Sequence, residues 1–248
     1  MNLKNIKYIA VLGAGESGTG AAILAKKKWF DVFVSDISGI QDNFIQLLEK
    51  NQIAFEEKNH SIEKILNADL IIKSPGIPDK APVIQSIKEK GIPLISEIEF
   101  AFHFTKAKII GITGSNGKTT TTLLTYHIFK NAGLDVACAG NVGNSFAMAI
   151  CDRDYEYIIL ELSSFQLDDI IDFKSHIAVL LNITPDHLDR YHYDMNEYAL
   201  SKFRVINKQT PNDYFIYDLD DEVTATYLTK YDIKAKQIPL SQKQKLST

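Results

Sequence analysis

Few cysteines and no long apolar run are the first features of this sequence. Its two cysteines, Cys138 and Cys151, cannot build a disulfide framework, and neither stands in a metal-type or redox-type pair. No stretch approaches the roughly 18 apolar residues that a membrane helix requires. Residues 8–12 follow two lysines, faintly as in a signal peptide, but this run is short and enters a glycine-rich turn without a cleavage pattern. We therefore expect a protein of a reducing cytoplasm that does not associate with membranes.

The sequence also lacks a large excess of charge of either sign. Its 27 Lys and Arg against 31 Asp and Glu give a net charge of -4 and a pI near 5.9. This balance argues against a broad nucleic-acid footprint, so any phosphate binding must come from local sites. The length of 248 residues, with 45% hydrophobic and 23% charged residues, is typical of a globular protein of one large or two ordinary domains.

The most informative stretch is residues 111–122, which read G-I-T-G-S-N-G-K-T-T-T-T after a short apolar run. A strand that ends in glycines and passes into a helix gathers backbone N–H groups and a helix N-terminus, which together form an anion site. Gly114 and Gly117 allow the backbone to curl around phosphate oxygens, Lys118 supplies a charge for the β and γ phosphates, and the Thr119 hydroxyl is placed to hold Mg²⁺. The pattern predicts an ATP-binding loop.

This loop is a variant of the strict nucleotide-binding pattern, because Ile112 stands where that pattern has glycine. A glycine-rich strand-to-helix turn with a chance lysine is the alternative interpretation. The order of strand, glycines, Lys-Thr and helix favours nucleotide binding.

The N-terminal region predicts a second ligand site. A strand at 8–12, a G-A-G-E-S-G turn at 13–18, a helix at 19–28 and a strand at 32–35 ending at Asp36 form a βαβ unit. The turn matches G-x-G-x-x-G, and the acidic residue about twenty positions later could accept from a ribose hydroxyl. Taken alone, this fingerprint would also fit an NAD-dependent oxidoreductase.

The remaining sequence continues the alternation of helices and strands. We expect a Rossmann-like N-terminal domain over residues 1–105 and a P-loop ATPase-type central domain with a mainly parallel sheet over 106–248, an α/β fold. Helices are expected at 44–50, 61–67, 83–90, 119–130 and 196–206, and strands at 70–73, 93–96, 136–139, 157–162, 177–182 and 214–217. The tail from 234 to 248 is polar and lysine-rich.

Three further residues could carry chemistry, each with a plainer alternative. Glu161 ends an apolar strand, where burial without a partner is costly, so we expect a metal or cation beside it, with a capping or salt-bridged glutamate as the alternative. His187 lies in a loop with two aspartates and could ligate a cation or be a surface-turn histidine. Lys202 lies at the edge of an apolar helical stripe, where most lysines are solvated.

Taken together, these stretches resemble the Mur ligases, the ATP-dependent amide-forming enzymes of peptidoglycan precursor synthesis. The motifs that carry the resemblance are G-I-T-G-S-N-G-K-T, G-N-V-G, E-L-S-S-F-Q-L, N-I-T-x-D-H-x-D-R-Y and the lysine fifteen positions after His187. Within the family, the ligase adding the third residue would have histidine in place of Phe165, and the one adding L-alanine usually has histidine in place of Asn116. Both departures favour the branch that adds D-glutamate.

The resemblance implies a role for each candidate residue. Lys118, His187 and Lys202 would be catalytic, and ATP would be bound by Gly114, Ser115, Asn116, Gly117, Lys118, Thr119 and Thr120. The UDP-linked substrate would be bound by Gly15, Glu16, Ser17, Asp36, Ile37, Ser74, Gly76, Asn141, Ser163, Gln166 and His187. Two Mg²⁺ ions would be held by Thr119, Glu161, His187 and a carbamylated Lys202.

The resemblance also implies the reaction and the partners. A monomeric enzyme of the bacterial cytoplasm would use ATP to activate UDP-MurNAc-L-Ala as an acyl phosphate, which the amine of D-glutamate then attacks. By the same resemblance, we expect the second domain to be incomplete and the family's C-terminal domain to be absent from this chain. We therefore expect the isolated chain to bind ligands without forming the amide bond at a useful rate, and a non-catalytic nucleotide-binding module is the rival interpretation.

Overall fold

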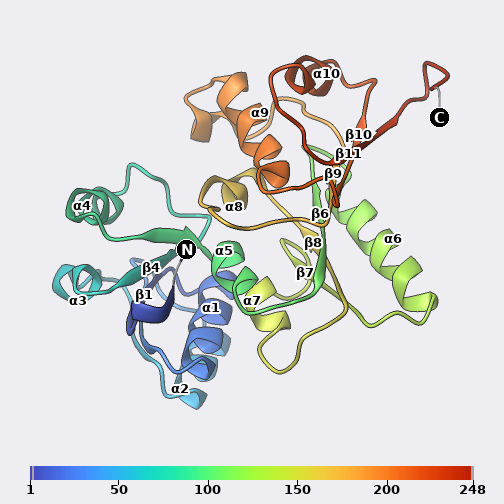
Figure 1. Cartoon of the computed structure of the whole chain (residues 1–248). Helices are drawn as coiled ribbons and strands as arrows, with labels where there is room; N and C mark the ends of the chain where they lie inside the picture. The colour runs from blue at the N-terminus through green and yellow to red at the C-terminus, as the bar shows by residue number, and fades with distance from the viewer. Residues whose placement is uncertain (2, 247–248) are drawn as a thin grey trace. The chain divides into compact units, whose positions relative to one another are not determined.

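The computed structural model describes residue 1 and residues 3–246 (Figure 1). They form two compact units. The first unit comprises Met1–Thr105, Asn144–Asp154 and Asp169–Asp172, and the second comprises Lys106–Gly143, Tyr155–Asp168 and Phe173–Thr248. The domain boundary after residue 105 stays a prediction, to which the structure adds that two short later segments pack with the first unit. No helix in the described part of the chain is long and apolar enough to span a membrane.

The first unit is built on a five-stranded parallel sheet in the order β3-β2-β1-β4-β5. Its strands are β1 (Tyr8–Leu12), β2 (Asp31–Ser35), β3 (Ala54–Glu56), β4 (Leu70–Lys73) and β5 (Leu94–Ser96). The strand β1 lies in the centre, with Ala10 opposite Phe33 on one side and Ile71 on the other. Strands buried on both faces require nearly continuous apolar residues, which is why the runs in β1, β2 and β4 predicted them.

Helices cover both faces of this sheet. They are α1 (Glu16–Lys27), α2 (Asp42–Lys50), α3 (Ile62–Leu66), α4 (Pro82–Lys90), α5 (Glu97–Phe102) and α7 (Phe146–Ala149), with a 3₁₀ turn η1 (Leu3–Asn5). The helices α3 and α4 lie on one side, and α1 and α2 lie on the other (Figure 1). Ile65 of α3 and Ile84 of α4 pack against Ala10 and Leu12 of β1 in one core cluster.

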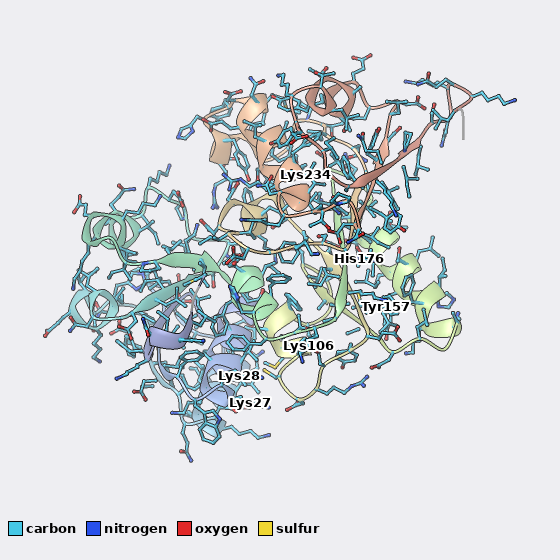
Figure 2. The ribbon with its side chains drawn as sticks, in the orientation of Figure 1. Lys27, Lys28, Lys106, Tyr157, His176 and Lys234 are labelled. Carbon is cyan, nitrogen blue, oxygen red and sulfur yellow. The ribbon has the colours of Figure 1, made fainter. Side chains whose placement is uncertain are left out.

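The helix α1 begins three residues earlier than the sequence predicts. The sequence predicts a turn through Gly18, but the helix starts at Glu16, whose carboxylate in the first turn is stabilised by the positive end of the helix dipole. At the other end, Lys27 and Lys28 lie where the helix stops (Figure 2), and Lys27 occupies the last turn, where a cation is favourable.

The second unit is built on a six-stranded sheet in the order β11-β10-β9-β6-β8-β7, and all its strand pairs are parallel. The strands are β6 (Lys108–Thr113), β7 (Val136–Gly140), β8 (Tyr157–Glu161), β9 (Ile177–Leu180), β10 (Tyr214–Asp218) and β11 (Lys236–Leu240). The prediction of an α/β fold with parallel sheets is therefore confirmed.

The edge strand β11 falls in the tail for which the sequence predicts only polar character. Four of its five residues are exposed, so no buried apolar run marks it as a strand. Pro239 also counts against a strand, although an edge strand tolerates proline. Residues 247 and 248 of that tail lie outside the described residues.

The helices of the second unit also lie on two sides of its sheet. They are α6 (Lys118–Asn131), α8 (Ser164–Asp168), α9 (Met195–Phe203) and α10 (Glu222–Leu228), with 3₁₀ turns η2 (Leu188–Tyr191) and η3 (Arg204–Ile206). The helix α6 lies on the side opposite α8 and α9 (Figure 1). Its Phe129 ring packs against Tyr157 of β8, labelled in Figure 2, with ring centroids 5.3 Å apart.

Candidate active site

A pocket of about 830 Å³ lies at the carboxyl edge of the first sheet, where open α/β sheets place their ligands. The loops that follow β1, β2 and β4 line it. The predicted residues of the first unit all contribute to its wall, namely Gly15, Glu16, Ser17, Asp36, Ile37, Ser74 and Gly76. His60 and Ile62, which sequence reasoning did not select, also line the pocket.

The close packing of α1 against the loop after β1 requires glycine at position 18. A Cβ built on Gly18 would lie 1.8 Å from the carbonyl oxygen of Gly13, which is backbone and cannot move aside cheaply. Asp36 holds the same loop, because its Oδ2 accepts from the Ala14 N–H at 2.7 Å and its Oδ1 accepts from the Ser38 N–H at 2.8 Å. The carboxylate predicted for ribose binding therefore already fixes two backbone segments of the pocket.

Lys73 holds another part of the pocket wall and was missed from the sequence. The residue is only 4% exposed and directly precedes the Ser74 turn. Its Nζ donates to the Ile77 carbonyl at 3.3 Å and to Asp79 Oδ1 at 3.2 Å. Asp169 Oδ2 lies 2.9 Å away as an ion pair without hydrogen-bond geometry. A buried ammonium with two carboxylates thus anchors the turn.

The predicted phosphate loop lies between β6 and α6 of the second unit. Gly117 has φ of +81° and caps α6, a left-handed conformation that favours glycine. The Lys118 Nζ donates to the Gly114 carbonyl at 2.9 Å and to the Ser115 carbonyl at 2.8 Å, so the ammonium folds back onto the loop. Thr119 and Thr120 are exposed in the first turn of the helix. These positions leave the helix N-terminus accessible to an anion.

The loop after β9 fixes the phosphate loop from the side. The Ser115 Oγ donates to the Thr184 carbonyl at 2.8 Å and accepts from the Thr184 N–H at 2.9 Å. Asn116 donates its backbone N–H to Asn182 Oδ1 at 2.9 Å and its side-chain amide to Thr184 Oγ1 at 3.0 Å. The N-I-T motif therefore has a structural role that the sequence did not reveal.

Glu161 is a buried carboxylate with one free oxygen. Its side chain is 1% exposed at the end of β8, and its Oε1 accepts from the Asn141 amide at 2.8 Å. Its Oε2 has no hydrogen-bond partner among the described residues. Leaving a carboxylate oxygen buried and unpaired is costly, so this geometry suits a cation better than the alternatives of a capping or salt-bridged glutamate.

Lys202 is buried in the structure. Most lysines at the edge of an apolar helical stripe are solvated, and that expectation is wrong for this residue. The side chain is 2% exposed, its Nζ donates to the Gly114 carbonyl at 2.8 Å, and its Nζ lies 4.5 Å from the centre of the Tyr198 ring. Burial, reinforced by the charge of Lys118, lowers the pKa of Lys202 to about 7. Lys118 and Lys202 thus share one carbonyl acceptor.

His187 stands apart from these groups. It adopts a left-handed backbone conformation with φ of +48°, its side chain is 63% exposed, and its Nε2 lies 3.7 Å from Asp186 Oδ1. Its ring centre lies 5.5 Å from that of Phe165. Within the described residues, no hydrogen bond or ion pair joins His187 to Glu161 or Lys202. Strained backbone conformations are often found at functional positions, but this conformation alone does not show what His187 does.

Ser163 and Gln166 form a capping box at the start of α8. The Gln166 Oε1 accepts from the Ser163 N–H at 2.9 Å, and the Ser163 Oγ accepts from the Gln166 N–H at 3.3 Å. The S-x-x-Q spacing is typical of such a cap, whereas the family resemblance implies only substrate contacts for both residues. Their side chains have at least this structural role.

Comparison with known proteins gives a family for both units. Residues 112–247 match the Mur ligase middle domain, and residues 8–83 match the MurD N-terminal domain. UDP-N-acetylmuramoylalanine--D-glutamate ligase from Bacteroides fragilis is 55% identical over 236 residues, which cover 95% of this chain and 53% of that protein. The protein of the same name from Christiangramia forsetii is 51% identical over 240 residues, which cover 97% of this chain and 54% of that protein. The chain spans about half the length of the curated relatives it matches.

Solved structures share the fold at low sequence identity. UDP-N-acetylmuramate:L-alanyl-gamma-D-glutamyl-meso-diaminopimelate ligase from Neisseria meningitides has a TM-score of 0.68 at 19% identity, covering 94% of this chain and 78% of that chain. UDP-N-acetylmuramate-alanine ligase from Thermotoga maritima has a TM-score of 0.60 at 20% identity, and the match covers 97% of this chain and 53% of that chain. Because the middle-domain match alone takes in more than half of the residues, the chain belongs to the Mur ligase family.

Proposed function

We propose that this chain binds the nucleotides of an ATP-dependent ligase that joins D-glutamate to UDP-N-acetylmuramoyl-L-alanine in peptidoglycan precursor synthesis. The observation that carries the proposal is the 55% identity to a ligase of that name over 95% of this chain. Phe165 and Asn116, the positions that favour the D-glutamate branch, agree with it.

The UDP end of the substrate is assigned to the pocket of the first unit. The α1 N-terminus behind Gly15, Glu16 and Ser17 offers backbone N–H groups for the diphosphate. Asp36 and Ile37, at the end of β2, and the Ser74 to Gly76 turn would contact the nucleoside and the sugar. Asn141, Ser163, Gln166 and His187, which belong to the second unit, stay predicted contacts of the UDP-linked substrate.

ATP is assigned to the loop of Gly114 to Thr120. Its glycines and the α6 N-terminus would surround the phosphates, while Lys118 would leave its two carbonyl acceptors for the β and γ phosphates. The ammonium is already beside the loop, so a rotation of the side chain suffices to redirect its charge. The structural role of Asn116 keeps the loop in shape during this exchange.

Mg²⁺ fits the residues present, because Glu161 Oε2 is a buried carboxylate oxygen without a partner. Glu161, Thr119, His187 and a carbamylated Lys202 would hold two ions, whose charge would offset the repulsion between a triphosphate and a carboxylate. The neutral amine of Lys202 would attack CO₂, form the N–C bond and lose a proton to give the carbamate. A pKa of about 7 leaves a large neutral fraction for this step near neutral pH.

The reaction follows from these assignments. An oxygen of the L-alanyl carboxylate attacks the γ phosphorus of ATP, ADP leaves, and an acyl phosphate forms. The D-glutamate amine then attacks the acyl carbon, inorganic phosphate leaves and the amide remains. In this scheme the chain positions both nucleotides, and Lys118 stabilises the charge that develops on the transferred phosphoryl group.

A chimera tests the proposal. This chain would replace the matching segment of the Bacteroides fragilis ligase, which is 55% identical to it. We expect phosphate release that depends on D-glutamate and UDP-MurNAc-L-Ala together, and loss of this activity on Lys118→Ala. A folded chimera that binds ATP but forms no amide would favour the non-catalytic interpretation. Turnover with a different amino acid in place of D-glutamate would assign the chain to another branch of the family.

A further inference from the structure

His60 lies in the pocket of the first unit without a role in the proposed function. It belongs to the segment after β3, which is tied to the turn after β2. The Lys58 N–H donates to the Ser38 carbonyl at 3.0 Å, and the Asn59 N–H approaches the Asp36 carbonyl at 3.4 Å. In a Rossmann-like unit the turn after β1 takes the phosphates and the end of β2 takes the nucleoside. His60 therefore lies at the nucleoside end of the pocket.

A short chain of hydrogen bonds determines which ring nitrogen of His60 carries the proton. The buried Ser35 Oγ lies 2.7 Å from Glu56 Oε1 and 2.7 Å from His60 Nδ1. Burial alone would raise the pKa of Glu56, but hydrogen bonds from Ser61 and Ser35 outweigh it and hold this pKa below its ordinary value. Glu56 is therefore an ionised acceptor, and the single Ser35 hydroxyl proton points to it.

The proton between Ser35 and His60 must then come from the imidazole. With its own proton donated to Glu56, the Ser35 Oγ can only accept, so His60 Nδ1 carries the hydrogen. Burial lowers the pKa of His60 below its ordinary value of 6.5, although the negative charges of Glu56 and Asp36 act to raise this pKa. The imidazole is thus neutral at pH 7.5, and its remaining nitrogen, Nε2, is the acceptor of a ring that lines the pocket.

We propose that His60 selects the uracil base by accepting a hydrogen bond from its N3–H at Nε2. The inference rests on the proposed function, which places a uridine nucleotide in this pocket. Uracil presents a donor at N3, whereas cytosine presents a lone pair at the same position, so the Nε2 lone pair attracts the first and repels the second. Ile62, which also lines the pocket, offers apolar surface to a ring held in this way.

Calorimetric titration of the 248-residue chain with UDP, CDP and N3-methyl-UDP tests the assignment. We expect UDP to bind about three- to tenfold more tightly than either analogue, the effect of one hydrogen bond between neutral groups. His60→Phe, which keeps a planar ring without an acceptor, should remove this preference. His60→Gln, whose amide oxygen accepts, should retain part of it. His127→Phe, at an exposed position of α6, is the matched control and should leave the preference unchanged.

The pH dependence distinguishes a base contact from a merely structural histidine. The charged groups that face His60 are Glu56 on β3 and Asp36 after β2, and Glu16 of α1 lines the same pocket. Protonation of His60 at Nε2 turns this atom from an acceptor into a donor, so the UDP-to-CDP affinity ratio should fall as the ring titrates. Because burial lowers the pKa of His60, this fall should begin only below pH 6.5. The second phosphate ionisation, near pH 6, is common to both nucleotides and cancels in the ratio.

The outcomes separate this inference from the proposed function. If the wild-type chain binds UDP and His60→Phe shows the same UDP-to-CDP ratio and pH profile, the base contact is wrong and the uridine site stands. If the wild-type chain binds no uridine nucleotide, the base contact and the assignment of the pocket both fail.

Discussion

Lys118→Ala is expected to weaken binding of Mg·ATP by one to a few kcal/mol and to lower kcat of the chimera by roughly 10²–10³-fold. The reason is that a compact ammonium facing the β and γ phosphates has no substitute among neutral side chains. In the structure this ammonium is held by the Gly114 and Ser115 carbonyls, so it is already beside the phosphate loop. Calorimetry with a non-hydrolysable ATP analogue measures the binding effect directly.

The control for this substitution is Lys130→Ala, which removes a cation from the exposed last turn of the same helix. It should leave nucleotide affinity within error of the wild type, because surface charges far from the loop are screened by salt. Equal nucleotide affinity in the wild type and Lys118→Ala would refute the assignment of the phosphate loop.

Lys202→Met is expected to change how stability depends on pH. The pKa of Lys202 is about 7 in the folded chain and near 10.5 in the unfolded chain. Between these values the unfolded chain binds more protons, so the free energy of unfolding of the wild type should rise with pH. The shift corresponds to roughly 4–5 kcal/mol as an upper limit. The variant lacks this contribution, so its stability relative to the wild type should be highest below pH 7 and should decline toward pH 10.5.

Denaturant unfolding of both proteins at several pH values measures this difference, in which the other titrating groups cancel. Lys234→Met is the matched control, because Lys234, labelled in Figure 2, is exposed. It should run parallel to the wild type. A difference between Lys202→Met and the wild type that stays constant from pH 6 to pH 10 would mean that the folded lysine titrates normally.

The sequence predicted the parts of the fold that depend on local pattern. Apolar runs such as 8–12 and 70–73 identified buried parallel strands, and the G-S-N-G-K-T sequence placed the strand-to-helix turn at β6 and α6. The strand β11 was not predicted, because an exposed edge strand needs only backbone hydrogen bonds with its neighbour. Such bonds produce no periodic pattern of apolar residues in the sequence.

The sequence could not reveal roles that depend on contacts between distant residues. Lys73 ends an apolar strand and is paired with Asp169, 96 positions away in the chain. His60 is hydrogen-bonded to Ser35, and Lys202 is buried against Gly114. Each of these effects arises from contacts between residues that are far apart in the sequence. A single sequence contains no local pattern that predicts such contacts. By contrast, the capping box at Ser163 and Gln166 is a local pattern, which the S-x-x-Q spacing alone can predict.

We propose above all that the pocket of the first unit takes the uridine nucleotide of a Mur ligase substrate. The most direct measurement is calorimetric titration of the 248-residue chain with UDP-MurNAc-L-Ala and, separately, with NAD. The claim predicts saturable binding of the uridine ligand and none of NAD. It also predicts loss of uridine binding on Gly18→Ala, whose Cβ would lie 1.8 Å from the Gly13 carbonyl oxygen. Saturable NAD binding without any response to UDP-MurNAc-L-Ala would contradict it and would favour an oxidoreductase site.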